Sequence, residues 1–148
     1  MQNNSHFTKN LLLVYPEIPD TYWSYRHAVR FAGKKALIPP LGLLTVAAMV
    51  PEGYECRLVD MNVEELTDED LEWADMLMIS AMIVQKPSME EVIRRSKGAD
   101  LPVVVGGPYA TSCHDEIDGV DHFILDEGEL TIPAFFRDLA QGTPQRMY

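Results

Sequence analysis

The fold of this chain is decided at residues 76–107, which read MLMISAMIVQKPSMEEVIRRSKGADLPVVVGG. Residues 76–80 and 103–105 are short, continuous apolar runs, typical of strands that are buried on both faces. Between them, Ser88 and Glu91 have the spacing of a capping box, which marks the start of a helix. A strand, a helix and a second strand in this order predict two parallel strands joined by a crossover helix.

The same alternation of strands and helices extends over the rest of the chain. Further buried strands are predicted at residues 11–15, 56–59 and 122–125, and further helices at 41–50, from Thr67 onward and at 129–140. The helix at 41–50 is apolar almost all round, so we expect it to be buried on more than one side. The pattern indicates an α/β fold: a doubly wound, flavodoxin-like (Rossmann-like) five-stranded parallel sheet in the order 2-1-3-4-5, with helices on both faces.

A long insertion follows the first strand. Residues 16–39 separate that strand from the next predicted helix, where loops of about 2–6 residues are usual. Asp20 and Gly33 have the character of caps for an extra helix, which would carry aromatic residues and part of a basic cluster at 26–35. The insertion leaves the carboxyl edge of the sheet, where ligands bind in this fold class, so it is either part of a ligand site, a lid, or a surface that docks on a neighbour.

Composition and charge exclude several classes of function. The chain has 148 residues and a net charge of −11, which makes it a poor candidate for binding nucleic acid. Cys56 and Cys113 are too far apart in the sequence to predict a metal cluster or a disulfide framework. The apolar stretch 36–50 is shorter than the ~20 residues of a membrane span, and no signal peptide is apparent, so we expect a cytoplasmic protein.

Small residues recur where the predicted strands end. They are Ser80, Ala81, Gly106, Gly107 and Gly128. Missing side chains at one sheet edge let a large ligand approach the backbone, although each glycine alone is also explained as a turn residue. The usual glycine-rich phosphate loops are absent, and an Asp that a phosphoacceptor domain would need is replaced by Ser80. We identify no metal ligands and no self-sufficient catalytic group.

Taken together, five short motifs resemble a known family. They are PPLGLL at 39–44, VDMN at 59–62, ISA at 79–81, VVGGP at 104–108 and GE at 128–129. In this order and spacing they resemble the N-terminal cobalamin-binding domain of cobalamin-dependent radical S-adenosylmethionine (radical SAM) enzymes. That family includes methyltransferases and enzymes labelled magnesium-protoporphyrin monomethyl ester oxidative cyclases.

The resemblance implies that residues 1–148 are a single cobalamin-binding domain taken from a longer protein. In the family, a downstream barrel carries Cys-x-x-x-Cys-x-x-Cys, which holds an iron–sulfur cluster and cleaves S-adenosylmethionine. That motif is absent here, so we expect the chain itself to bind rather than catalyse. Its partners are then cobalamin and the barrel of its own parent protein, which carries out methyl transfer or oxidative cyclisation.

One departure concerns the cobalt. Methionine-synthase-like cobalamin domains carry Asp-x-His-x-x-Gly after the first strand, and this chain has Pro16-Glu17-Ile18-Pro19-Asp20 there instead. The resemblance therefore implies base-off cobalamin without a protein histidine ligand. The expected cofactor-binding residues are Pro16, Tyr22, Trp23, Arg26, Pro40, Leu41, Gly42, Ser80, Ala81, Met82, Gly106, Gly107, Pro108, Glu127, Gly128 and Glu129.

These residues have different expected roles. The insertion would lie against the corrin, residues 80–82 would border the nucleotide tail, and Gly106 and Gly107 would let the ribose–phosphate pass close to the backbone. Residues 127–129 would close the far side of this channel. Two alternatives stay open: the same fold kept as an interaction or structural domain that does not bind cobalamin, and an unrelated flavodoxin-like regulatory domain.

Overall fold

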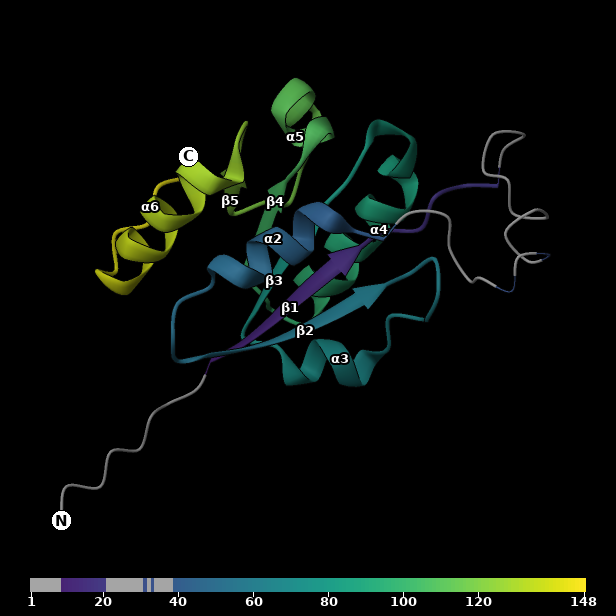
Figure 1. The fold of residues 1–148 in the computed structure, drawn as a ribbon, viewed down its shortest axis with the longest axis horizontal. Helices are drawn as coiled ribbons and strands as arrows, with labels where there is room; N and C mark the ends of the chain where they lie inside the picture. Colours follow the sequence, from purple (N-terminus) through teal and green to yellow (C-terminus); the bar gives the residue numbers. More distant parts are fainter. Residues whose placement is uncertain (1–8, 21–30, 32, 34–38) are drawn as a thin grey trace, which may run out of the picture.

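One parallel sheet forms the centre of the molecule. The computed structural model describes residues 9–20, 31, 33 and 39–148 (Figure 1). The five strands are β1 (Lys9–Tyr15), β2 (Tyr54–Asp60), β3 (Met76–Ser80), β4 (Val103–Gly106) and β5 (His122–Ile124). All neighbouring strands are parallel, and their order is β2-β1-β3-β4-β5. The predicted doubly wound α/β fold is confirmed.

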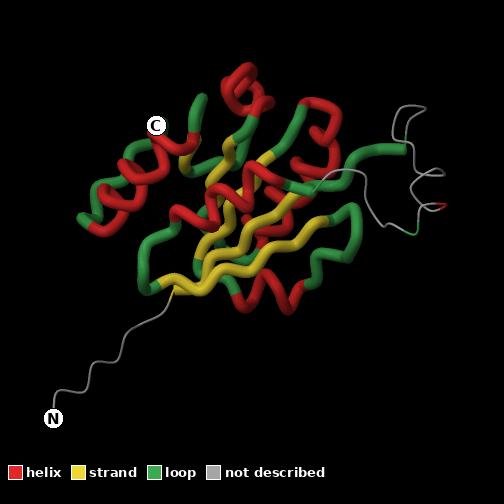
Figure 2. Tube along the Cα trace, viewed as in Figure 1, coloured by secondary structure: helices red, strands yellow, loops and turns green. Residues whose placement is uncertain are grey.

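Helices cover both faces of this sheet (Figures 1 and 2). One face is covered by α2 (Leu41–Met49) and α6 (Gly128–Ala140), and the other by α3 (Asp68–Trp73), α4 (Lys86–Gly98) and α5 (Pro108–Cys113). Two short 3₁₀ turns complete the described elements, η2 (Ile83–Gln85) and η3 (His114–Glu116). The extra helix expected over residues 20–33 lies mostly outside the described residues.

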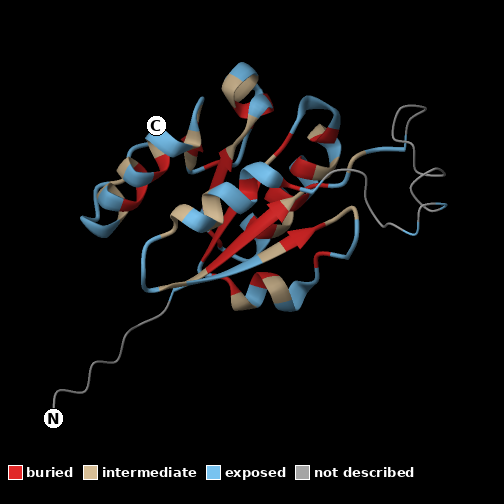
Figure 3. Ribbon diagram, viewed as in Figure 1, coloured by how far each residue is buried: buried red, intermediate tan, exposed pale blue. Residues whose placement is uncertain are grey.

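Two hydrophobic cores lie back to back across the sheet. Leu12 and Val14 of β1 pack with the α3–α4–α5 layer, whereas Leu11 and Leu13 pack with α2 and α6. This split follows from strand geometry, because consecutive side chains of a strand point to opposite faces. The continuous apolar runs therefore mark strands with no solvent-facing side, as the buried centre of the sheet shows (Figure 3).

The strands are in register at their carboxyl ends. Ser80 at the end of β3 lies opposite Gly106 of β4, and Gly106 lies opposite Ile124 of β5. The chain leaves β1 toward β2 on one side and leaves β3 toward β4 on the other, so the connections diverge between β1 and β3. This topological switch point is where open α/β sheets bind ligands.

Local details confirm one expectation and correct two. Thr67 caps α3 through a capping box with Asp70, at the helix start that the sequence predicts. Ser88 does not start a helix, because α4 already begins at Lys86; its hydroxyl accepts a hydrogen bond from the Glu17 backbone N–H at 2.9 Å. In α2 only Leu43 is buried, and Leu41 is 63% exposed, so the expected burial on more than one side is wrong for the described structure.

The end of the chain adds an unpredicted piece of sheet. Residues 141–148 contain no apolar run, yet Met147 forms a parallel bridge with Phe123 at the outer edge of β5. The Phe123 N–H donates to the Arg146 carbonyl at 2.7 Å, and the Leu125 N–H donates to the Tyr148 carbonyl at 2.9 Å. These bonds satisfy backbone groups of β5 that β4 does not reach.

A buried glutamine links the two chain segments that meet at the switch point. Gln85 is fully buried, and its side-chain amide donates to the Pro16 carbonyl at 2.5 Å while its carbonyl accepts from the Met82 N–H at 2.8 Å. It thereby joins the segment after β1 to the turn after β3. Asn62 makes a second link to the segment after β1, since its side-chain oxygen accepts a hydrogen bond from the Ile18 N–H at 2.8 Å.

We expect Gln85→Leu to lower the free energy of unfolding by about 1–3 kcal/mol, because the variant leaves the Met82 N–H without its partner. Urea unfolding measures this change. The control Gln141→Leu alters an exposed glutamine and should stay within about 0.5 kcal/mol of the parent. Equal stability of the two variants would show that Gln85 does not fasten the switch point.

Candidate functional site

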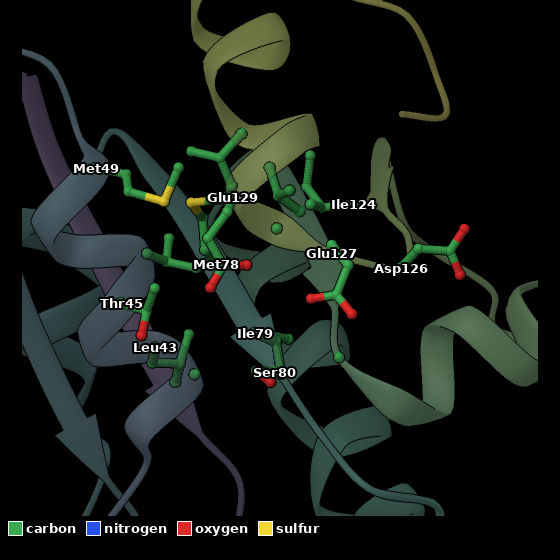
Figure 4. A pocket seen from close by; sticks show the side chains of 17 residues that line it. Leu43, Thr45, Met49, Met78, Ile79, Ser80, Ile124, Asp126, Glu127 and Glu129 are labelled. Carbon is green, nitrogen blue, oxygen red and sulfur yellow. The ribbon is translucent and has the colours of Figure 1, made fainter.

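A pocket opens at the carboxyl edge of the sheet, between α2 and α6. Its volume is about 210 Å³, and residues from the ends of β3, β4 and β5 form its base (Figure 4). The pocket lies on the face of the sheet covered by α2 and α6, next to the switch point between β1 and β3. Its position matches the place where the sequence predicts a ligand.

The interior and the mouth of this pocket differ in chemistry. The buried lining side chains are apolar: Leu43, Met78, Ile79, Val104, Ile124 and Ile132. The exposed lining side chains include Thr45 and three carboxylates, Asp126, Glu127 and Glu129. In Figure 4, the carboxylates lie toward α6 and the turn before it, whereas Leu43, Thr45 and Met49 project from α2. An apolar interior with a polar mouth suits a ligand that is apolar at its tip and polar behind it.

Glycines keep part of the pocket open. A Cβ at Gly42 would meet nothing closer than the Ser80 hydroxyl oxygen at 4.0 Å, so the missing side chain leaves free space between α2 and β3. A Cβ at Gly106 would lie 3.0 Å from the Ile124 carbonyl oxygen. Gly107 has a φ of +87°, and a Cβ there would lie 2.5 Å from the Ser80 hydroxyl oxygen. The fold itself therefore requires Gly107, whereas it does not require Gly42.

The structure brings together seven of the residues expected to bind a cofactor. Those that line the pocket are Gly42, Ser80, Gly106, Gly107, Glu127, Gly128 and Glu129. Those that are described but do not line it are Pro16, Pro40, Leu41, Ala81, Met82 and Pro108. Tyr22, Trp23 and Arg26 lie outside the described residues. Their roles as cofactor ligands stay predictions.

Several residues of the pocket were missed from the sequence. Leu43, Val46 and Met49 lie three residues apart along α2 and share the side that faces the pocket. Met78 and Val104 come from the strands below. The three-residue spacing on α2 was a usable signal, but apolar residues with helical spacing are more often core than ligand contacts.

Apolar side chains are also exposed along the carboxyl edge outside the pocket. Ile83 is 61% exposed and Val84 is 49% exposed in η2, directly after β3, and Leu41 at the start of α2 is 63% exposed. Because α2 begins and β3 ends at this edge, these side chains offer apolar surface on the same edge as the mouth. Large exposed apolar patches mark interaction sites, so this edge is a candidate for one.

Two titratable groups of this edge, Asp60 and Tyr15, lie at the ends of β2 and β1. Asp60 is buried at the end of β2, and its carboxylate accepts hydrogen bonds from the Asn62 N–H at 3.0 Å and the Asn62 side-chain amide at 2.8 Å. Burial, and then the charge of Asp60, raise the pKa of the Tyr15 hydroxyl above its ordinary value. Tyr15 is therefore uncharged at neutral pH and adds no anionic ligand to the site.

The pocket supplies no metal-ligand set. No group of three or more His, Cys, Asp or Glu side chains suited to a metal ion occurs among the described residues. Neither described histidine lines the pocket: the His122 ring pairs with the Gln145 carbonyl at 2.6 Å, and His114 packs against the Phe123 ring. The described helices include none with the length and apolar character needed to cross a bilayer.

Comparison with known proteins identifies a family. Residues 31–136 match the family model described as the B12 binding domain. An uncharacterized methyltransferase of Synechocystis sp. is 47% identical over 133 residues, which cover 88% of this chain and 25% of that protein. The hopanoid C-2 methylase of Rhodopseudomonas palustris is 34% identical over 124 residues, covering 83% of this chain and 23% of that protein. The chain thus spans about a quarter of the length of these relatives.

Two glycine substitutions should distinguish a glycine that the fold requires, Gly107, from a glycine that only leaves space in the pocket, Gly42. We expect Gly107→Ala to lower the free energy of unfolding by at least about 1–3 kcal/mol, because its backbone conformation excludes other residues. Gly42→Ala should leave stability unchanged or raise it by up to about 1 kcal/mol, since Gly42 is helical and has room. Thermal and urea unfolding measure both effects, and equal losses would contradict the assignment.

Proposed function

This chain belongs to the B12-binding domain family, and from that premise we propose that it holds cobalamin with the nucleotide tail in the pocket between α2 and α6. The corrin would then lie over the carboxyl edge of the sheet, beside the insertion after β1. The observation that carries this proposal is the pocket itself, which opens at the carboxyl edge beside the switch point and combines an apolar interior with a polar mouth.

The shape and chemistry of the pocket fit the tail. The terminal base of the tail is a flat, apolar ring, which suits the interior formed by Leu43, Met78 and Ile132. The ribose behind it carries hydroxyl groups, which suit acceptor oxygens at the mouth such as those of Glu127 and Glu129. The open space at Gly42 gives the tail a way between α2 and Ser80.

A corrin bound over the carboxyl edge would cover the apolar side chains that are exposed there. Leu41 and Ile83 lie at the carboxyl edge and have no cover within the described structure. A corrin over this edge would remove their surface from water, which favours binding by roughly 25 cal/mol for each Å² of apolar surface buried. Pro16 and Met82 belong to the same edge and are held in place by Gln85.

We further propose the base-off state, without a histidine ligand to cobalt. The sequence after β1 lacks Asp-x-His-x-x-Gly, and the two described histidines do not line the pocket. The base of the tail cannot reach cobalt while it lies in the pocket. Affinity would then come from burial of the tail and from contacts with the corrin and its amides.

The whole protein is proposed to be a cobalamin-dependent radical SAM enzyme that transfers a methyl group. The methyltransferase and methylase names of two relatives, of which this chain covers only about a quarter, support the methyl transfer. The radical SAM part of the proposal rests on the resemblance of the sequence motifs. When bound, cobalamin supplies a methyl group carried on cobalt. The part of this chain that lies at the pocket binds and orients the cofactor. The iron–sulfur cluster and S-adenosylmethionine belong to a separate barrel domain, and oxidative cyclisation is the alternative reaction.

A second candidate function is an interaction domain that does not bind cobalamin. The exposure of Leu41 and Leu44 on α2 favours it, because a protein partner could cover these side chains as well as a corrin could. The third reading, an unrelated flavodoxin-like regulator, is wrong, because the chain belongs to the B12-binding domain family.

Titration of the 148-residue chain with hydroxocobalamin, followed by gel filtration and a visible spectrum, tests the proposal. We expect cobalamin to elute with the protein and to show a base-off spectrum. A base-on or histidine-ligated spectrum would overturn the base-off state while keeping the cofactor. Failure to elute together would favour the interaction domain.

Gly42→Leu should weaken cobalamin binding by about 5-fold to 150-fold, because an overfilled site costs about 1–3 kcal/mol. The added side chain would project into the free space between α2 and Ser80. Gly98→Leu is the matched control, since Gly98 is exposed at the end of α4 and has no atom within 4 Å of its Cβ position. Unchanged affinity in Gly42→Leu would place the tail elsewhere.

A further inference from the structure

The buried side chains that line the pocket are all apolar, whereas the two lining residues with hydroxyl groups, Ser80 and Thr45, are half-buried and exposed, respectively. Leu43, Met78, Val104, Ile124 and Ile132 form its buried part, and Val46 and Met49 of α2 extend it. The backbone below is also committed, because β3 and β4 pair through this region with Met78 opposite Val104. A ring placed here would therefore meet methyl, methylene and thioether groups and find few hydrogen-bond partners.

We propose that this interior selects corrinoids by the base at the end of their tail, favouring a benzimidazole over a purine. The inference rests on the proposed function, since it requires the tail to occupy the pocket. It goes further by assigning specificity to Val46, Met49 and Met78, none of which is a residue expected from the family motifs. The two bases are similar in size, so the discrimination is chemical.

A purine carries hydrogen-bonding groups that the interior cannot satisfy. Adenine brings ring nitrogens and an exocyclic amine, and each buried polar group without a partner loses its bonds to water. A dimethylbenzimidazole instead presents two methyl groups, each worth about fourfold in affinity when buried. Binding sites reject unmatched polar groups more strongly than they reject missing methylenes, so we expect a preference of about 10-fold to 100-fold.

The exposed carboxylates at the mouth of the pocket suit the ribose of the tail better than its phosphate. Asp126, Glu127 and Glu129 are exposed there, and no Lys or Arg is among the described lining residues. Carboxylates repel a phosphodiester and accept hydrogen bonds from ribose hydroxyls. The phosphate therefore stays outside the mouth, the ribose lies at it, and the base extends into the apolar interior.

The test compares three corrinoids on the 148-residue chain, each in its hydroxo or aquo form: cobalamin, the cobamide that carries adenine, and cobinamide, which lacks the nucleotide. Dissociation constants come from absorbance titration. We expect cobalamin to bind about 10-fold to 100-fold more tightly than the adenine form. Cobinamide should bind more weakly than cobalamin, because it leaves the pocket empty.

The three constants separate failure of this inference from failure of the proposed function. If none of the corrinoids binds, the proposed function is wrong. If cobinamide binds as tightly as cobalamin, the tail does not use the pocket. If cobalamin and the adenine form bind equally, and both more tightly than cobinamide, the function stands and the selectivity is overturned.

A single substitution should reduce the preference. Met49→Gln places an amide in the apolar part of the pocket, and we expect it to narrow the ratio of the two dissociation constants by at least about threefold. Met147→Gln is the matched control, because Met147 is 49% exposed and does not line the pocket. Urea unfolding verifies that both variants fold, and an unchanged ratio in folded Met49→Gln would contradict the role of Met49.

Discussion

The structure depends on one constraint: the central strands are buried on both faces. Consecutive residues such as Leu12 and Leu13 point to opposite cores, so the chain must supply a helical layer on each side of the sheet. To supply both, its connections must diverge at some pair of strands, and here they diverge between β1 and β3. The helix α2 therefore lies beside α6 on one face, and the pocket opens between these two helices at the carboxyl edge. Gln85 stabilises the neighbouring switch point by bonding to both Pro16 and Met82.

Much of this architecture could be predicted from the sequence, because buried parallel strands leave a plain pattern of continuous apolar runs. The runs at β1 and β3 located the strands, and their alternation with helices indicated the order. The start of α4 was predicted wrongly because Ser88 is a residue type that commonly caps helices. In the structure its hydroxyl instead accepts a hydrogen bond from the backbone N–H of Glu17, which is distant in the sequence. The bridge at Met147 was missed because long-range pairing leaves no local pattern.

The site was harder to predict than the fold, for a physical reason. Gly107 attracts attention as a small residue at the sheet edge, yet its positive φ and its closeness to Ser80 already explain it. The sequence gives no reason to single out Met49 and Met78 as pocket residues, because apolar residues on a helix and a strand usually belong to the core. Only the three-dimensional arrangement shows that their side chains border open space. Sequence motifs locate the edge where a ligand binds, and packing determines what the pocket there can hold.

The two edge strands of the sheet, β2 and β5, determine how readily the sheets of two molecules can pair. An unpaired strand edge is a template on which another chain can add a strand. At β5 that edge is occupied by residues 146–148, whose backbone groups bond to Phe123 and Leu125. At β2 the exposed edge carries Glu55 and Arg57, and Arg57 is held by Asp70 at 2.8 Å and lies over the Trp73 ring. Residues 146–148 thus cover the β5 edge of the sheet, and charged side chains line the β2 edge. Both features disfavour aggregation by edge-to-edge pairing.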